Sequence, residues 1–299
     1  ALSSARVVTG RDKLLVFNDG YHGGVIKFLG GRCALNMPFD FVVANYNDID
    51  GTADLIDQTG DELACVIDEP VLGAGGNIQG NRQFLQMLRQ KTREVGALLI
   101  FDEVKTGRLG PSGVQGMVGI DPDLTTLGKF IGGGLPTGAF GGSAEVMAHF
   151  NPREKGALAH AGTFNNNVCS MAAGCAAMRD IYTPERAAEF FDWSEAFRLS
   201  LNEMFAAKAV PMYANGIGSM IALHFSREPT KRPSDITTGC RALRPLLHME
   251  LLLDGMLVCG RGDLFLSLPM DESHLSAAHE ALEKFADRYQ PLIEEVLAA

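Results

Sequence analysis

Several features that mark other protein classes are missing from this sequence. No apolar run approaches the length of a bilayer-spanning helix, and the N-terminus has no signal-peptide pattern, so we expect no membrane segment. None of the six cysteines forms a Cys-x-x-Cys pair, and the seven histidines form no His-Glu-x-x-His motif. These spacings give no metal site, and a zinc enzyme is excluded. The cysteines lie in apolar segments such as "ACVI", so we expect reduced, mostly buried thiols in a cytoplasmic protein.

Positive charge is also scarce. The 299 residues include 26 Lys and Arg against 36 Asp and Glu, which gives a formal net charge of −10. A nucleic-acid partner would require a basic face, so this class of partner is excluded. Apolar residues make up 46% and charged residues 21%, which is typical of a soluble globular protein with one large domain or two ordinary ones.

Apolar segments and helical patterns alternate along the first two thirds of the chain. The segments "KLLVF", "ELACVI" and "ALLIF" are continuously apolar, and an amphipathic helix, "RQFLQMLRQKTREVG", separates the last two. Strands of this kind indicate a mostly parallel sheet with helices on both faces, an α/β fold. The first residues resemble the last turns of a helix that ends at Gly10, as if the chain began inside an element.

The pattern changes near residue 206. Antiparallel strands are predicted in "MYANGIGSMIALHF", a helix in "CRALRPLLHMELLLDG", short strands in "MLVCG" and "LFLSL", and a last helix from about Asp271. A further helix begins at Pro184, after Thr183, and ends at about Ala207. We therefore predict a large cofactor-binding domain over 1–205 and a small α+β domain over 206–299.

Polar side chains follow each of the three apolar strands. In an open parallel sheet, ligands bind outside the carboxyl ends of the strands, so these side chains are expected to meet at one edge. The residues concerned are Tyr21 and His22 after the first strand, Asp68 and Glu69 after the second, and Asp102 and Glu103 after the third.

One lysine stands in an unusual setting. Lys129 lies in "LTTLGKFIGGGLPTGAFGG", and no other charged residue occurs between Asp123 and Glu145. A lysine amine, a carboxylate and an aromatic face together suit pyridoxal phosphate, whose aldehyde binds an amine and whose ring nitrogen needs an acid. We expect desolvation to favour the neutral amine, and we expect the glycines to let the backbone approach the cofactor.

The motifs together resemble the class III pyridoxal-phosphate aminotransferases. They are "YHGG", "IDEPVLGAGGNIQG", "FDEVKTGRLG", "PDLTTLGKFIGGGLPTGAFGG" and "HAGTFNNN", and glutamate-1-semialdehyde 2,1-aminomutase and its relatives form the most similar subgroup. The resemblance implies fold type I. It also implies that Lys129 is the Schiff-base lysine, that Asp102 pairs with the pyridine nitrogen and that Val104 packs on the ring. Tyr21 matches the aromatic residue that stacks on the cofactor, with His22 beside it.

The resemblance also implies an assembly. Glu69 matches the glutamate near the cofactor and substrate, and Gly162 and Thr163 match a loop that reaches the phosphate of the neighbouring subunit in a homodimer with shared active sites. The family's Ser-Gly-Thr-Glu-Ala loop and N-terminal segment are missing. No arginine is matched to a substrate-carboxylate clamp, and Arg261 is more consistent with a surface turn.

Several reactions remain open at this point. The resemblance implies an aminotransferase that moves an amino group from an amino donor to a keto acid or aldehyde, but an aminomutase or a racemase would share the motifs, and a truncated, non-catalytic paralogue is the alternative. A nucleotide-binding oxidoreductase is disfavoured, because "VLGAGG" has Ile78 where the third glycine of the fingerprint belongs. A phosphate-binding P-loop fails as well, because no Ser or Thr follows Lys129.

Overall fold

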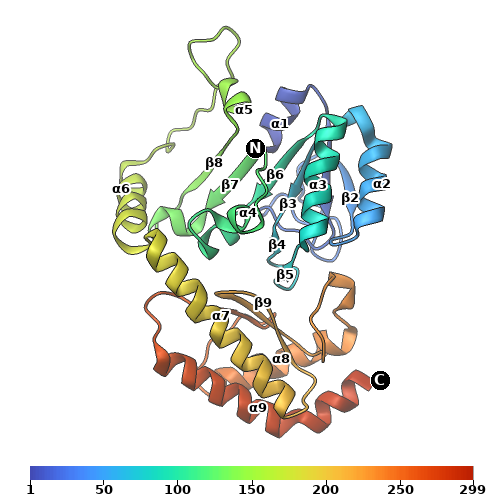
Figure 1. Ribbon diagram of the computed structural model, residues 1–299, viewed down its shortest axis with the longest axis vertical. Coiled ribbons are helices and arrows are strands. Elements are labelled where there is room, and N and C mark those ends of the chain that lie inside the picture. Colours follow the sequence, from blue (N-terminus) through green and yellow to red (C-terminus); the bar gives the residue numbers. More distant parts are fainter. Residues whose placement is uncertain (299) are drawn as a thin grey trace. The chain divides into compact units, whose positions relative to one another are not determined.

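The protein is described here from a computed structural model that covers residues 1–298 and divides into two compact units (Figure 1). The first unit holds 1–73 and 80–187, and the second holds 74–79 and the chain from residue 188 onward. One long helix, α7 (Pro184–Ala207), begins in the first unit and continues in the second. The division into domains at residues 205 and 206, at the end of this helix, stays a proposal.

The first unit contains most of the elements. They are α1 (Leu2–Thr9), β1 (Lys13–Phe17), β2 (Asp40–Ala44), α2 (Ile49–Thr59), β3 (Leu63–Asp68), β4 (Val71–Leu72), α3 (Arg82–Val95), β6 (Leu98–Asp102), α4 (Gly113–Val118), β7 (Leu124–Gly128), β8 (Gly138–Gly142), α5 (Ala144–Ala148) and α6 (Val168–Ala176). Short 3₁₀ turns cover Gly60–Glu62, Thr106–Leu109 and Lys129–Gly132, and a π-helical turn at Ala177–Ile181 extends α6.

A six-stranded sheet organises this unit, in the order β2-β1-β3-β6-β7-β8. The first five strands are parallel and β8 is antiparallel to β7. The mostly parallel α/β fold predicted from the apolar strands is therefore confirmed. Strands β2, β7 and β8 and helix α2 were not predicted, because their segments are short, polar or rich in glycine.

The two faces of the sheet bury different side chains, because successive residues of a strand point to opposite sides. Leu14 and Val16 of β1 pack with α1 in one apolar cluster. Phe17, on the other face, makes edge-to-face contacts with Tyr46 and Phe84, at the α2 and α3 side (Figure 1). Side chains therefore pack on both faces of β1, and a ligand is expected at the strand ends.

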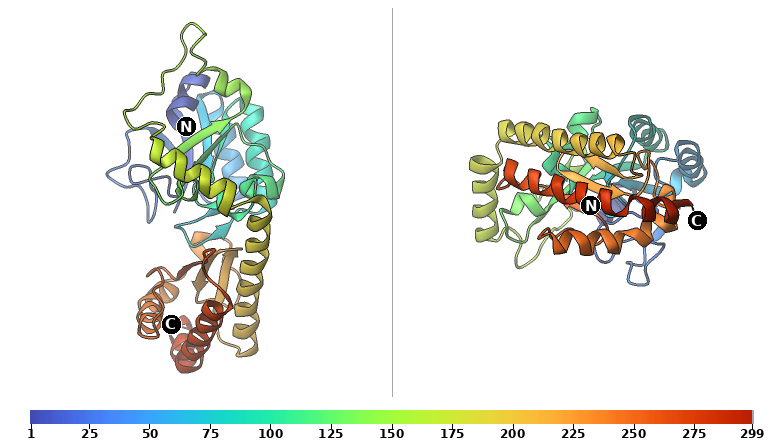
Figure 2. Two further views of the ribbon diagram at one scale, coloured as in Figure 1. Left: turned by 90° about the vertical axis from the view of Figure 1, so that its left-hand side faces the viewer. Right: turned by 90° about the horizontal axis from the view of Figure 1, so that it is seen from below.

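The second unit is an α+β arrangement. It contains β5 (Ile78–Gln79), most of α7, β9 (Tyr213–Ile217), β10 (Met220–His224), α8 (Thr238–Leu253), β11 (Asp263–Phe265) and α9 (Glu272–Ala298). Strands β9, β10 and β11 form an antiparallel sheet in the order β11-β10-β9, and α8 packs against α9 (Figure 2). The predicted strand in "MLVCG" is wrong, since residues 256–259 have no regular structure. Among residues 1–298, no helix has both the length and the apolar character needed to cross a bilayer.

Candidate active site

Four adjacent parallel strands deliver the predicted side chains to one edge of the sheet. In the order β1-β3-β6-β7, the residues at or just beyond the carboxyl ends are Tyr21 and His22, Glu69, Asp102, and Lys129. This edge is where an open α/β sheet binds its ligands. The structure therefore places these residues, from four strands, at one edge of the sheet, whereas Asp68 and Glu103, which were also expected there, face the other side.

Asp102 and His22 form a buried acid–base pair. Nδ1 of His22 lies 2.7 Å from Oδ2 of Asp102, and the two side chains are 3% and 9% exposed. Burial by itself would lower the pKa of His22 and raise the pKa of Asp102, but their hydrogen bond and opposite charges outweigh it. The pKa of His22 is therefore raised and the pKa of Asp102 lowered, so both directions favour the charged pair.

Glu69 connects this pair to the loop that carries Tyr21. Its Oε1 accepts a hydrogen bond of 2.8 Å from the backbone N–H of Tyr21, and its Oε2 accepts one of 3.1 Å from Gly73 N–H. Burial raises the pKa of Glu69, the charge of His22 acts against the rise, and Asp102 adds to it. Glu69 therefore fixes the backbone of the Tyr21 loop, whereas the Tyr21 side chain itself is 41% exposed.

The other two strand-end acids point away from this site. Asp68 is paired in register with Phe101, so Asp68 and Glu103 lie on the face opposite to Glu69 and Asp102. Glu103 accepts hydrogen bonds from the backbone N–H groups at the start of α4, of 3.1 Å from Val114 and 2.7 Å from Gln115. Its role is structural. Both carboxyl oxygens of Asp68 are buried and have no hydrogen-bond partner in the described part of the chain, and burial raises its pKa well above the usual value.

Lys129 follows β7 in an uncommon backbone conformation. Its φ is +51°, which non-glycine residues rarely adopt, and its side chain is exposed. Among the described residues, its ammonium group has no hydrogen-bond or ion-pair partner. The sequence predicted a desolvated lysine, but the side chains of this chain do not enclose it.

Two glycines allow a close contact between the lysine loop and α6, and the expected approach of the loop backbone to the cofactor stays a prediction. Gly133 has φ +58°, and a Cβ there would lie 2.3 Å from the carbonyl oxygen of Ala173 in α6. A Cβ at Gly174 would lie 2.4 Å from the carbonyl oxygen of Ile131. These glycines let the backbone of α6 pack closely against the lysine loop.

The other residues that the sequence analysis singled out are Val104, Gly162, Thr163 and Arg261. Val104 lies next to Gly128: a Cβ added at Gly128 would be 3.4 Å from Cγ1 of Val104. Gly162 and Thr163 lie in an exposed loop between α5 and α6, and no hydrogen bond of the described residues joins them to Lys129 or Asp102. In the second unit, Arg261 forms a 2.9 Å ion pair with Asp263 at a turn.

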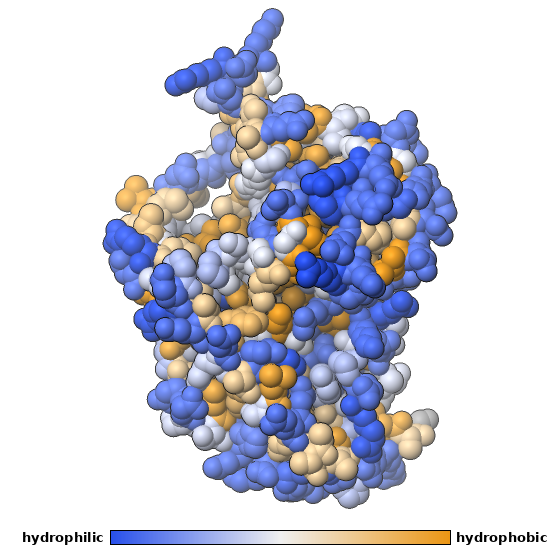
Figure 3. Space-filling view, viewed as in Figure 1, coloured by the Kyte–Doolittle hydropathy of each residue, from blue (hydrophilic) through white to orange (hydrophobic). Residues whose placement is uncertain are grey.

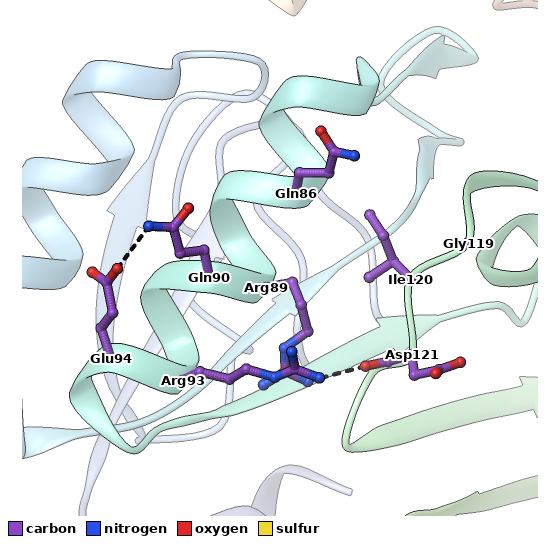
Figure 4. A pocket seen from close by; sticks show the side chains of 8 residues that line it. All are labelled: Gln86, Arg89, Gln90, Arg93, Glu94, Gly119, Ile120 and Asp121. Carbon is purple, nitrogen blue, oxygen red and sulfur yellow. Dashed lines mark hydrogen bonds between the residues drawn. The ribbon is translucent and has the colours of Figure 1, made fainter.

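Two cavities of the first unit lie away from the side chains of the candidate site. One of about 560 Å³ is bounded by α3 and residues 119–121, where Arg89 donates a 3.1 Å hydrogen bond to the carbonyl oxygen of Asp121 (Figure 4). Another of about 570 Å³ is lined by Glu103, Phe130, Tyr182 and their neighbours. Lys129 and Asp102 line neither of these two cavities.

Two side chains near the site were missed by the sequence analysis. Thr126 donates a hydrogen bond of 3.1 Å to Oδ1 of Asp102. Lys105 lies close to Glu69, since a Cβ at Gly73 would be 2.8 Å from Lys105 Nζ and 3.1 Å from Glu69 Oε2. Both stand inside motifs that were recognised, but nothing in the spacing indicates which way their side chains point.

Comparison with known proteins agrees with this geometry. Residues 1–284 match the family model "Aminotransferase class-III". The chain is 44% identical to the β-phenylalanine transaminase of Variovorax paradoxus over 98% of this chain and 67% of that protein. It is 37% identical to glutamate-1-semialdehyde 2,1-aminomutase of Bordetella avium, over 94% of this chain and 67% of the relative.

Solved structures show the same fold. The crystal structure of the β-phenylalanine aminotransferase from Variovorax paradoxus superposes with a TM-score of 0.94, at 44% identity, over 97% of this chain and 67% of that one. A structure described as a transaminase with PLP bound matches with a TM-score of 0.81, at 27% identity, over 99% of this chain and 70% of that one. With the strand-end site in place, the fold, the motifs and these matches lead to one conclusion: this chain belongs to the class-III aminotransferases, pyridoxal-phosphate enzymes of fold type I.

Proposed function

We propose that this chain transfers amino groups from an amino donor to a keto acid or aldehyde, with Lys129 and Asp102 as its catalytic residues. The observation that supports this most is the convergence of a lysine, a buried His–Asp pair and an exposed aromatic ring at the carboxyl ends of adjacent parallel strands. The assignment of individual residues is our own, and the comparisons identify the family and the cofactor.

The residues present suit pyridoxal phosphate. The amine of Lys129 is exposed and unpaired among the described residues, and the exposed ring of Tyr21 contacts no other aromatic ring of this part of the chain. Oδ2 of Asp102 accepts one hydrogen bond, from His22, and keeps a second lone pair. A reactive amine, a flat apolar surface and an acid with a free lone pair are the three groups that this cofactor requires.

When bound, pyridoxal phosphate supplies an aldehyde for covalent attachment of amines and a protonated ring that accepts electrons from the adjacent carbon. Asp102, kept ionised by His22, holds the proton of the ring nitrogen. Lys129 Nζ would hold the aldehyde of the cofactor, and its free amine would serve as the base that moves the proton of the carbon next to the amino group. Glu69 orients the Tyr21 loop by its hydrogen bond to Tyr21 N–H.

Borohydride reduction and peptide mapping test the assignment: a pyridoxyl group on Lys129 supports it, and a tag on another lysine contradicts it.

For the substrate, we propose a β-amino acid as donor and a keto acid as acceptor. The support is the 44% identity to a β-phenylalanine transaminase, against 37% to an aminomutase, over nearly the whole chain in both cases. The purified protein should convert β-phenylalanine and a keto acid into the amino acid of that acceptor, which chromatography detects. Rearrangement of glutamate-1-semialdehyde without a second substrate would favour the aminomutase instead.

We also propose a homodimer with shared active sites, in which Gly162 and Thr163 reach the cofactor phosphate of the neighbouring subunit. Phe164 and Val168, beside this loop, are 83% and 79% exposed, and apolar residues gather over α6 at the left edge of Figure 3. A second copy of the chain would bury this apolar surface and would also enclose the exposed side chain of Lys129. Light scattering should show a dimer for the unmodified protein and a monomer for Val168→Asp. An unmodified protein that is monomeric at high concentration contradicts the proposal.

The compartment we propose is the cytoplasm. All six cysteines are unpaired in the structure. Cys65 and Cys240 are buried as expected, but Cys169 and Cys175 are exposed, so the prediction of mostly buried thiols is only partly correct. Exposed free thiols persist in reducing compartments. Cell fractionation that recovers the protein outside the cytosolic fraction would contradict this assignment.

A further inference from the structure

The carboxylate of Asp102 receives three hydrogen bonds from three parts of the first unit. Oδ2 is bonded to His22 Nδ1 at 2.7 Å, and Oδ1 accepts from Val104 N–H and from the Thr126 hydroxyl, both at 3.1 Å. Asp102 itself is 7% exposed. The proposed reaction gives roles to His22 and Asp102 but none yet to the hydroxyl group of Thr126.

The direction of the Thr126 side chain follows from the sheet. Thr126 is the register partner of Asp102 across β6 and β7, and its carbonyl oxygen accepts a 3.0 Å hydrogen bond from Glu103 N–H. The neighbouring Thr125 points to the opposite face, where its hydroxyl donates a 3.2 Å hydrogen bond to Gln115 Oε1. Two chemically identical side chains, one residue apart, therefore have separate partners, and only one of them contacts the candidate site.

The two oxygens of Asp102 are left in different states. A carboxylate oxygen has two lone pairs, so Val104 N–H and the Thr126 hydroxyl together occupy Oδ1, whereas Oδ2 keeps one lone pair beside His22. We propose that Thr126 is a positioning residue that fixes the rotation of the Asp102 carboxylate and presents Oδ2 to the ring nitrogen of the cofactor. This inference rests on the proposed function, because it assumes that Asp102 is the partner of that nitrogen.

The charges around Asp102 show why a neutral donor is useful. His22 is the cation in contact with it, and the acids whose charges interact with it are Glu69, Asp68 and Glu103. These acids favour protonation of Asp102, and the donors oppose it. His22 loses its charge as the pH rises, whereas the hydroxyl of Thr126 donates at every pH. Thr126 therefore stabilises the ionised carboxylate under conditions in which His22 has become neutral.

The test uses Thr126→Val, which keeps the branched shape and removes the hydroxyl, with Thr125→Val as the matched control and Thr126→Ser as the rescue variant. The measurement is the dissociation constant of pyridoxal phosphate from the purified apoprotein, by absorbance titration between pH 5 and pH 9. Hydrogen bonds to charged groups predict a loss of affinity of roughly tenfold or more for Thr126→Val. The acidic limb of the affinity profile should also move to higher pH, because Asp102 is then protonated more easily. Thr126→Ser should bind within about threefold of the unmodified protein, since it keeps the donor.

The outcomes separate this inference from the proposed function. Thr126→Val that binds pyridoxal phosphate as tightly as Thr125→Val, with the same acidic limb, overturns the role of Thr126 while the proposed function stands. Equal losses in both valine variants also overturn it, because the effect then comes from packing of β7. An unmodified protein that binds no pyridoxal phosphate overturns both proposals. If Thr126→Val does not fold, Thr126→Ser and Thr126→Ala decide, with serine binding as the unmodified protein does and alanine weakly if the inference holds.

Discussion

The buried carboxyl of Asp68 predicts an unusual dependence of stability on pH. The side chain is fully buried, and neither oxygen has a hydrogen-bond partner among residues 1–298. Desolvation, followed by the charges of Glu69, Asp102 and Glu103, raises its pKa well above the usual value. Asp68 is therefore a neutral acid in the folded protein under conditions in which it is ionised in the unfolded chain.

The direction of the effect follows from linkage. Because the folded-state pKa of Asp68 lies above its unfolded value of about 3.9, the contribution of its proton is fully present below that pH and is lost as the pH rises through the folded-state pKa. In this interval one extra proton is bound by the folded state, so the free energy of unfolding falls by about 1.4 kcal/mol per pH unit. For a chain of this size, a slope of about 1.4 kcal/mol per pH unit corresponds to roughly 3–5 °C in the melting temperature per pH unit.

The assay compares the unmodified protein with Asp68→Asn, which cannot ionise, by thermal melting at several pH values from 5 to 8. We expect the difference in melting temperature between Asp68→Asn and the unmodified protein to change in favour of the variant as the pH rises, because only Asp68 can ionise. Asp61→Asn, an exposed position before β3, is the matched control and should show no such trend. A constant difference between Asp68→Asn and the unmodified protein across this range would refute the reasoning.

Three further predictions follow from the site. Lys129→Ala should lose the visible-violet absorbance of the loaded enzyme and its turnover, because the amine proposed to bind the cofactor aldehyde is removed; retained turnover would contradict the assignment. His22→Leu should lower the melting temperature most near pH 6, since the raised pKa of His22 makes its charged pair with Asp102 stabilising at low pH and less so as the pH rises, and an equal loss at pH 6 and pH 9 would argue against it. Gly133→Ala should destabilise the fold by at least about 2 kcal/mol through strain at φ +58° and contact with Ala173, whereas Gly141→Ala, where a Cβ meets nothing within 4 Å, should melt close to the unmodified protein.

Much of the first unit could be predicted from the sequence, because its signals are local. The strands around Leu14, Cys65 and Leu99 are continuously apolar, and Gly10 and Gly96 end helices in the left-handed conformation as glycine commonly does. The second unit gave weaker signals. Its strand over Asp263–Phe265 is three residues long, and "MLVCG" has the composition of a strand but no partner in the sheet.

Some features of the candidate site could be predicted from the sequence, and others could not. The types and order of its groups are written in the motifs: a lysine in a glycine-rich loop, acids after apolar strands, and an aromatic residue next to a histidine. Strand alternation and register decide their directions, and these place Asp102 and Glu69 on one face and Glu103 and Asp68 on the other. Thr125 and Thr126 could not be told apart for the same reason.

The sequence by itself determined the fold class and the chemistry, because apolar periodicity and reactive side chains are properties of short segments. Only the tertiary structure decided that Asp102 is cradled by His22, Val104 and Thr126, and that the glycines after Lys129 accommodate α6. Those facts depend on contacts between segments far apart in the chain, whose distances no local pattern encodes.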